Sequence, residues 1–523
     1  MNASSTPATR REFLADVGRG MLIATVGSSL ASDLGLAPAY GAGAEGAEAL
    51  NFGDLESLVC LMQETPVDKL LPKLTAELKR GTELRRLVAA GALANARTFG
   101  GEDYVGFHTI MALSPAFHMA RELTGPQQAL PVFKVLYRNT NRIQEKGGRK
   151  EEVLHPVKAT APSETRLGSE ELRAAIHRKD VNAAEQTFAS LAQLSPEDAF
   201  NNLLHAVQEY TEVHRVVLPY RAWDLLDVTG REHAHTLLRQ SVRYCVRNEA
   251  SRAANGDELR TLLPKLLEEH HLIDHPLGSR AAEDAWVEQF VQTLLQSTPA
   301  QAAAAAAAAL AEGFAPAHLG EAISLTANQL VLRDHGRTPR EEQAGKLTGS
   351  VHGDSIGVHA SDSANAWRNM ARVSNARNTH ACLILGAYQV AFDRTNRGGD
   401  FQNWQPLPVK WHLDQVKATT PEALLKEADE AIRQNLQAHA AGLIHRYGEL
   451  GHPPRPVFDL LLRYAVSEDG ALHAEKYYRT VSEEFNSTRP AFRWRQLVAL
   501  ARVTASEYGR PAPGIAEARA LLG

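Results

Sequence analysis

The chain has 523 residues, a net charge of −5 at neutral pH, 44% hydrophobic residues and 22% charged residues. This length suits several domains or an array of repeated units, and the composition is that of an ordinary soluble protein. The slightly acidic balance gives no reason to expect a nucleic-acid partner. Cys60, Cys245 and Cys382 lie far apart in the sequence and form no CxxC pair. This excludes a disulfide scaffold and cysteine-based zinc or iron–sulfur sites.

The N-terminus carries the most specific pattern in the sequence. Thr9-Arg10-Arg11-Glu12-Phe13-Leu14 precedes an apolar run at residues 21–26 and small residues that end near residue 42. It resembles a twin-arginine export signal, so residues 1–44 are predicted to be signal and linker. We therefore expect a periplasmic or extracellular protein with no integral membrane segment after signal removal. The alternative is a disordered basic N-terminus of a cytosolic protein.

The rest of the chain shows helical periodicity. Apolar residues recur three and four positions apart, as in Leu70, Leu71, Leu74 and Leu78, and alternating β-type patterns are scarce. The alanine run at residues 302–309 is predicted to be helix, because alanine has the highest intrinsic helix propensity. The predicted fold class is all-α.

The sequence also repeats itself. Thr65-Pro66 precedes Ala94-Asn95 by the same spacing that separates Thr298-Pro299 from Ala327-Asn328. Two clear copies and two weaker ones predict internally repeated helical units that pack around a central, histidine-lined cavity. The predicted units are residues 45–150, 165–275, 280–400 with an insertion at 335–351, and 415–523.

Histidines recur within these units. Gly106-Phe107-His108 aligns with Gly357-Val358-His359, and weaker alignment adds His214 and His452 as equivalent positions. Further histidines precede and follow this set at similar spacing, namely His205, His352 and His445 before it and His235, His380 and His473 after it. Repeated histidines can each be structural within their own unit. They can also converge as metal ligands, since a metal needs only three or four of them.

Residues 351–362 hold the densest group of candidate side chains. The stretch includes His352, Asp354, His359 and Asp362, and its glycines argue against one unbroken helix. We expect a loop that enters a helix, with Ser361 or Asp362 as the N-cap. A polar turn with capping residues is the alternative reading of this stretch.

Short stretches such as Phe107-His108-Thr109-Ile110 and Val358-His359-Ala360-Ser361 begin helices with histidine. In this the chain resembles the questin-oxidase-like family, whose members are helical, rich in histidine and associated with oxygen insertion into aromatic ketones. The resemblance implies an oxidoreductase and assigns no particular residue. Motifs of common hydrolases, dehydrogenases and c-type cytochromes are absent from the sequence.

The leading hypothesis is an exported oxidoreductase or oxygenase that acts on a small organic substrate at a transition-metal site, with iron as the favoured metal. The predicted metal ligands are His352, His359, His214, His205, His452 and Asp354, and the predicted catalytic residues are His359, Asp362 and His108. One alternative is metal-free catalysis with His359 as general base and Asp362 orienting it. The other is a non-catalytic helical-repeat protein that binds a partner or serves as a scaffold.

Overall fold

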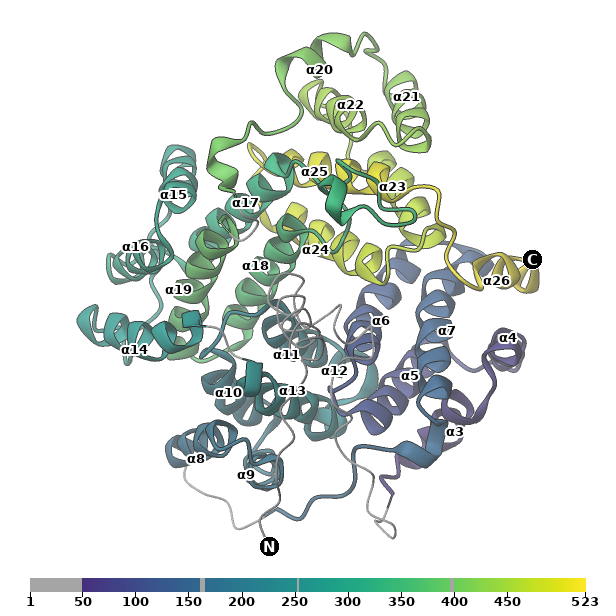
Figure 1. Cartoon of the computed structure of the whole chain (residues 1–523), viewed down its shortest axis with the longest axis vertical. Coiled ribbons are helices and arrows are strands. Elements are labelled where there is room, and N and C mark those ends of the chain that lie inside the picture. Colours follow the sequence, from purple (N-terminus) through teal and green to yellow (C-terminus); the bar gives the residue numbers. More distant parts are fainter. Residues whose placement is uncertain (1–48, 160–164, 252–253, 396–398) are drawn as a thin grey trace, which may run out of the picture.

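The computed structural model describes residues 49–159, 165–251, 254–395 and 399–523 (Figure 1). Helices joined by loops make up this part of the chain, and it contains no β-strand beyond isolated bridges. The all-α prediction is thus confirmed. The predicted export signal lies outside the described residues.

The helices are labelled in chain order, and most are two to five turns long. In the first half they are α3 (Glu56–Glu64), α4 (Leu70–Lys79), α5 (Leu84–Phe99), α6 (Tyr104–Glu122), α7 (Leu130–Glu145), α8 (Thr165–His177), α9 (Val181–Leu191), α10 (Pro196–Val207), α11 (Val213–Asp224), α12 (Leu226–Thr229), α13 (Ala234–Asn248) and α14 (Ala254–Glu269). In the second half they are α15 (Asp284–Gln296), α16 (Pro299–Ala311), α17 (Pro316–Arg333), α18 (Ile356–Val373), α19 (Ala376–Asp393), α20 (Lys410–Gln415), α21 (Pro421–Arg433), α22 (Gln437–Glu449), α23 (Arg455–Ser467), α24 (His473–Ser487), α25 (Trp494–Glu507) and α26 (Ile515–Leu522).

Four helices form a ring at the centre of the molecule. Helix α6 contacts α11, α11 contacts α18, α18 contacts α24, and α24 returns to α6 (Figure 1). Each central helix is flanked by neighbours in sequence: α5 and α7 pack on α6, α10 and α13 on α11, α17 and α19 on α18, and α23 and α25 on α24. Apolar side chains fill the space between the central and flanking helices, as Trp367 of α18 does with no exposed surface. The repeat itself and its unit boundaries remain predictions.

Three of the central helices begin at side-chain caps. Asp103 accepts a hydrogen bond from the Gly106 N–H at 2.8 Å, and Glu212 accepts one from the Arg215 N–H at 3.0 Å. Ser355 accepts one from Val358 at 3.3 Å. Such caps satisfy backbone donors that have no partner within the helix, so they fix where each helix starts.

The cap at Ser355 corrects the predicted start of α18. The helix begins at Ile356, so Ser361 and Asp362 lie inside it rather than at its N-cap. Gly357 lies inside the helix, and a glycine is needed there because α17 passes very close. A Cβ at this position would come within 2.6 Å of the Val331 backbone nitrogen. The glycine therefore serves helix packing and does not interrupt the helix.

The alanine-rich segment forms helix α16, as predicted. The Thr298 side chain accepts a hydrogen bond from the Gln301 N–H, and the Gln301 side chain accepts one from the Thr298 N–H. This capping box, followed by Pro299 in the first turn, starts a helix that runs to Ala311. Several alanines of this helix are fully buried against its neighbours.

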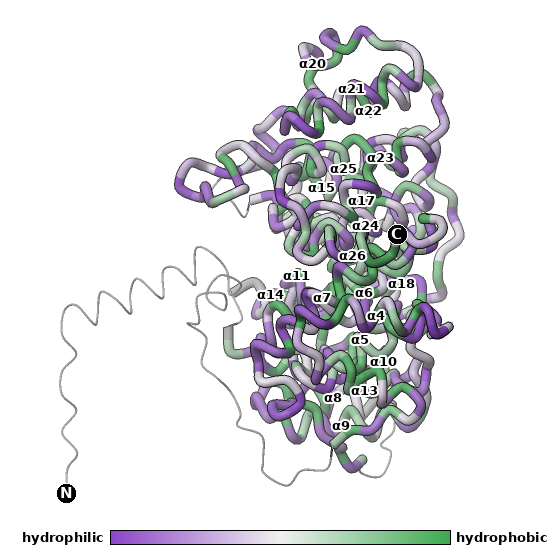
Figure 2. The backbone as a smooth tube through the Cα atoms, turned by 90° about the vertical axis from the view of Figure 1, so that its right-hand side faces the viewer, coloured by the Kyte–Doolittle hydropathy of each residue, from purple (hydrophilic) through white to green (hydrophobic). Residues whose placement is uncertain are grey.

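Polar and apolar residues alternate along almost every helix (Figure 2). Helices α20, α21 and α22 project from one end of the molecule in both views (Figures 1 and 2). Within the part of the chain that the structure describes, no helix combines the length and apolar character needed to cross a membrane.

Candidate functional site

Four histidines, one from each central helix, meet where the helices begin. The Nε2 atoms of His108 and His214 are 3.2 Å apart, and so are those of His359 and His473. The ring centroids of His108 and His473 are 5.1 Å apart, and those of His214 and His359 are 6.0 Å apart. His108, His214 and His473 are buried, whereas His359 is half-buried. The four imidazoles therefore form a closed ring, referred to below as the four-histidine cluster.

The outer nitrogens of three rings bond to fixed acceptors. The Nδ1–H of His108 donates to the Tyr104 carbonyl at 2.7 Å, and that of His473 donates to the Gly470 carbonyl at 3.3 Å. The Nδ1–H of His214 donates to the Glu212 carboxylate at 2.7 Å. Each proton therefore sits on the outer nitrogen, and each Nε2 presents a lone pair to the inside of the cluster. Imidazoles that ligate metals are oriented by the same kind of outer partner.

The contact between His108 and His214 has an unusual consequence. Both Nδ1 atoms already hold a proton, so two lone pairs face each other across 3.2 Å. Two such nitrogens attract each other only when a proton or a metal cation lies between them. The pair of His359 and His473 differs, because no side chain among the described residues fixes the Nδ1 of His359. The Nε2–H of His359 can therefore donate to the Nε2 of His473.

Protonation of the cluster is disfavoured. Burial, with the nearby Lys476 charge as the second cause, holds the pKa values of His108 and His473 well below the usual range. Burial and the neighbouring His214 and Lys476 lower the pKa of His359 to about 3. The imidazoles of His108, His359 and His473 are therefore neutral at physiological pH, which is the form that binds metals.

The dimensions of the cluster resemble those of a metal site. Bonds of about 2.0–2.1 Å to a tetrahedral metal place ligand nitrogens about 3.4 Å apart, close to the 3.2 Å seen within each pair. Nevertheless, no group of three or more histidine, cysteine, aspartate or glutamate side chains in the described ranges is already arranged to hold one ion. The widest gap separates His214 from His359, and side-chain rotation must close it before the two pairs can share a metal.

Three of the six predicted histidines are brought together, and three are not. His108, His214 and His359 belong to the cluster, but the fourth member is His473 in place of His452. His452 lies in the connection after α22, where its Nε2 is 3.3 Å from the Thr419 carbonyl. His205 is half-buried on α10 near Arg173, Arg377 and Glu209. Neither His452 nor His205 is placed to join the other ligands, so their assignment to that site is corrected.

The acidic ligands predicted from residues 351–362 have other partners. Asp354 forms ion pairs with Lys346 at 2.7 Å and with Arg337, so its charge is already neutralised. Asp362 accepts a hydrogen bond from the Thr480 hydroxyl at 2.8 Å rather than from His359. His352 is buried in the loop before α18, and its Nε2 has no partner in the described structure. No contact places His352 in the cluster.

Sequence reasoning placed His473 in the second set of repeated histidines but not among the predicted ligands, and it gave no role to Lys476. His473 is the first residue of α24, and Lys476 follows one turn later with 3% of its surface exposed. The signal for His473 was its place in the first turn of a helix, a feature shared with His214 and His359. For Lys476 no such signal exists, since a lysine in an amphipathic helix is usually exposed.

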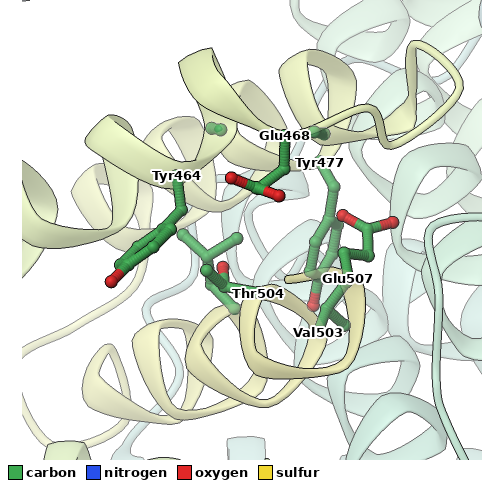
Figure 3. A pocket seen from close by; sticks show the side chains of 9 residues that line it. Tyr464, Glu468, Tyr477, Val503, Thr504 and Glu507 are labelled. Atoms are coloured by element: carbon green, nitrogen blue, oxygen red, sulfur yellow. The ribbon is translucent and has the colours of Figure 1, made fainter. Parts of the chain in front are cut away.

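The described structure has two pockets away from the cluster, and neither is the predicted histidine-lined cavity. One, of about 10 Å³, has room for about one water molecule and lies between α23, α24 and α25 (Figure 3). Glu468, Tyr477 and Glu507 line it, and no histidine does. The other, of about 620 Å³, lies beside α26 and includes Leu130, Val466 and Leu522.

Glu507 in the smaller pocket supports a pH-dependent prediction. Burial raises its pKa to about 7, while one carboxylate oxygen accepts the Gly353 N–H at 2.8 Å (Figure 3). The folded protein then binds more protons than the unfolded chain between about pH 4.5 and 7, so stability falls as the pH rises through this window. Glu507→Gln keeps an acceptor and does not titrate, so its stability should lack this fall, which we expect to be roughly 2–3 kcal/mol. Unfolding midpoints of both proteins from pH 4.5 to 8 measure the difference, and parallel curves would contradict the prediction.

Comparison with known proteins gives no match: no family model, no curated protein and no solved structure was found to resemble this chain. The functional argument therefore rests on the residues of the chain.

Proposed function

We propose that the four-histidine cluster binds one transition-metal ion and that the protein is a metal-dependent oxidoreductase acting on a small organic substrate. The observation that carries the proposal is the facing pair of His108 and His214. Their outer nitrogens are committed as donors, so a cation between the Nε2 atoms is the simplest group that satisfies both lone pairs. A proton between the two nitrogens is the other solution, and burial opposes its placement on His108.

The ligand set favours iron, copper or zinc, because neutral imidazole suits these ions. Iron remains the proposed metal, and the oxidising chemistry is supported by the resemblance to the questin-oxidase-like family. The bound metal would supply activation of oxygen or polarisation of a substrate carbonyl. The protein's contribution is to orient three of the imidazoles through Tyr104, Glu212 and Gly470.

An anaerobic titration of the metal-free protein with iron(II) tests the proposal. We expect saturation at about one equivalent per chain and, after admission of oxygen, consumption of oxygen that the metal-free protein does not show. Saturation with zinc but no reaction of the iron form with oxygen would retain the metal site and reject the oxidoreductase. If the folded protein binds neither iron, copper nor zinc, both the metal site and the oxidoreductase activity are overturned.

A second candidate is metal-free acid–base catalysis. Lys476 favours it, because burial lowers the pKa of its ammonium to about 8 and brings it into the range useful for proton transfer. His359, whose Nδ1 has no fixed side-chain partner, would act beside it. The same titration separates the two candidates, since only the first requires a metal.

The proposed site of action is outside the cytoplasm. The support is the Thr9-Arg10-Arg11-Glu12-Phe13-Leu14 pattern of the sequence. Replacement of both arginines by lysine should leave the protein in the cytoplasmic fraction, whereas the unaltered protein is exported. Equal distribution of the two proteins between the fractions would reject the export signal.

A further inference from the structure

Lys476 is a buried cation without a counter-ion. It lies one turn after His473 on α24, and 3% of its surface is exposed. Its ammonium makes no hydrogen bond and no ion pair within the described part of the chain, and its electrostatic neighbours are Asp362, Arg221 and Glu475. Burial of an unpaired ammonium is costly, so its retention calls for a ligand of opposite charge.

Lys476 lies close to the four-histidine cluster, one helical turn after His473. Its charge is among the causes that lower the pKa values of His108, His359 and His473, three of the four rings. The cluster therefore has an ammonium at its edge, where a ligand held by the histidines would also contact it.

The helix ends around the cluster add to this positive potential. His214, His359 and His473 all lie in the first turn of their helices, and His108 follows directly after the first turn of α6. The four N-termini therefore converge on the cluster. Each carries a partial positive charge of about half an elementary charge, which attracts anions.

The nearby carboxylates do not balance these charges once a metal is bound. Glu212 is engaged by His214, by the Arg215 N–H at 3.0 Å and by the Tyr244 hydroxyl at 2.8 Å. Asp362 is engaged by Thr480. Two further carboxylates near the site are balanced by cations of their own: Glu475 by Lys134, and Asp354 by Arg337 and Lys346. A divalent ion together with Lys476 then brings three positive charges against the two negative ones of Glu212 and Asp362, before Arg221 and the helix ends are counted.

We propose that the site binds its substrate as an organic anion whose charged oxygen is received by the Lys476 ammonium beside the four histidines. The substrate class is a small molecule that carries a carboxylate, phenolate or enolate oxygen. This inference deepens the proposed function and rests on it for the excess positive charge. In this role Lys476 is a residue that selects the charge of the substrate, and the hydrogen bond it forms is charge-assisted.

The test uses two pairs of probes that differ mainly in charge: formate with formamide, and benzoate with benzamide. Binding to the metal-loaded, full-length protein is measured by calorimetry in a low-chloride buffer. We expect at least one anion to bind about tenfold or more tightly than its amide. Lys476→Met should abolish this preference, Lys476→Arg should keep it, and Lys410→Met, which removes an exposed lysine of α20, should leave it unchanged.

Metal content, measured on the same samples, separates this inference from the proposed function. Lys476→Met should bind metal as the wild type does and should be at least as stable, because an unpaired buried charge is removed. A metal-loaded wild type without preference for the anions, or a Lys476→Met variant that keeps the preference or fails to fold, overturns the inference. A protein without metal that still prefers anions through Lys476 rejects the metal site alone.

Discussion

The His214→Ala variant is expected to lose its bound metal, while His452→Ala keeps it. His214 is a member of the cluster, and its ring is oriented by Glu212, whereas His452 lies after α22 and is placed near the Thr419 carbonyl. Loss of a ligand from such a site should reduce metal affinity by at least about 100-fold, more than the loss of an outer partner. The same result is expected for His108→Ala and His473→Ala.

Metal analysis after dialysis, combined with circular dichroism to verify folding, measures this effect. His452→Ala is the matched control, because it removes a histidine that sequence alignment places in the same set. Equal loss of metal in His214→Ala and His452→Ala would show that the metal is not held by the cluster. Full metal content in a folded His214→Ala variant would show the same.

The largest effect on stability is expected at a buried ion pair between α7 and α24. The Lys134 ammonium lies 2.6 Å from the Glu475 carboxylate, and Glu475 has no exposed surface. The ammonium also donates to the carbonyls of Ala465 at 2.8 Å and Glu468 at 2.6 Å. Lys134→Met should cost about 3–5 kcal/mol, because it leaves a buried charge and two carbonyls without their donor.

A double-mutant cycle tests the origin of this cost. Lys134→Met/Glu475→Gln removes both charges, so the double variant should be more stable than Lys134→Met alone, with a coupling energy of about 1–3 kcal/mol. Thermal unfolding midpoints of the wild type, the two single variants and the double variant give the order of their stabilities. A Lys134→Met variant within about 1 kcal/mol of the wild type, or strictly additive effects, would contradict the account. Glu475 lies two residues after His473, so this pair anchors the first turn of α24 to α7.

Local sequence rules predicted the parts of the fold that depend on local physics. The alanine run forms α16 because propensity and a capping box at Thr298 act in the same direction. The start of α18 was missed because Gly357 was read as a helix breaker. Its role is set by the close approach of α17, which is a tertiary contact and leaves no local mark in the sequence.

The candidate site was predicted for three of its four histidines. His108, His214 and His359 share a position near the start of a helix, and alignment of the repeats found them. The fourth was misplaced because α20, α21 and α22 form a projecting excursion, and the His452 pattern belongs to the end of that excursion (Figure 1). His473 begins α24, two helices after α22, and the contacts of α24 with both α6 and α18 bring it into the cluster.

X-ray absorption at the metal edge of the loaded protein tests the central claim most directly, because it counts the imidazoles bound to the ion. The account predicts three or four imidazole ligands at about 2.0–2.1 Å in the wild type. It predicts one fewer in His473→Ala and an unchanged count in His452→Ala. A spectrum without imidazole ligands, or one that His473→Ala leaves unaltered, would contradict a metal site built from the four central helices.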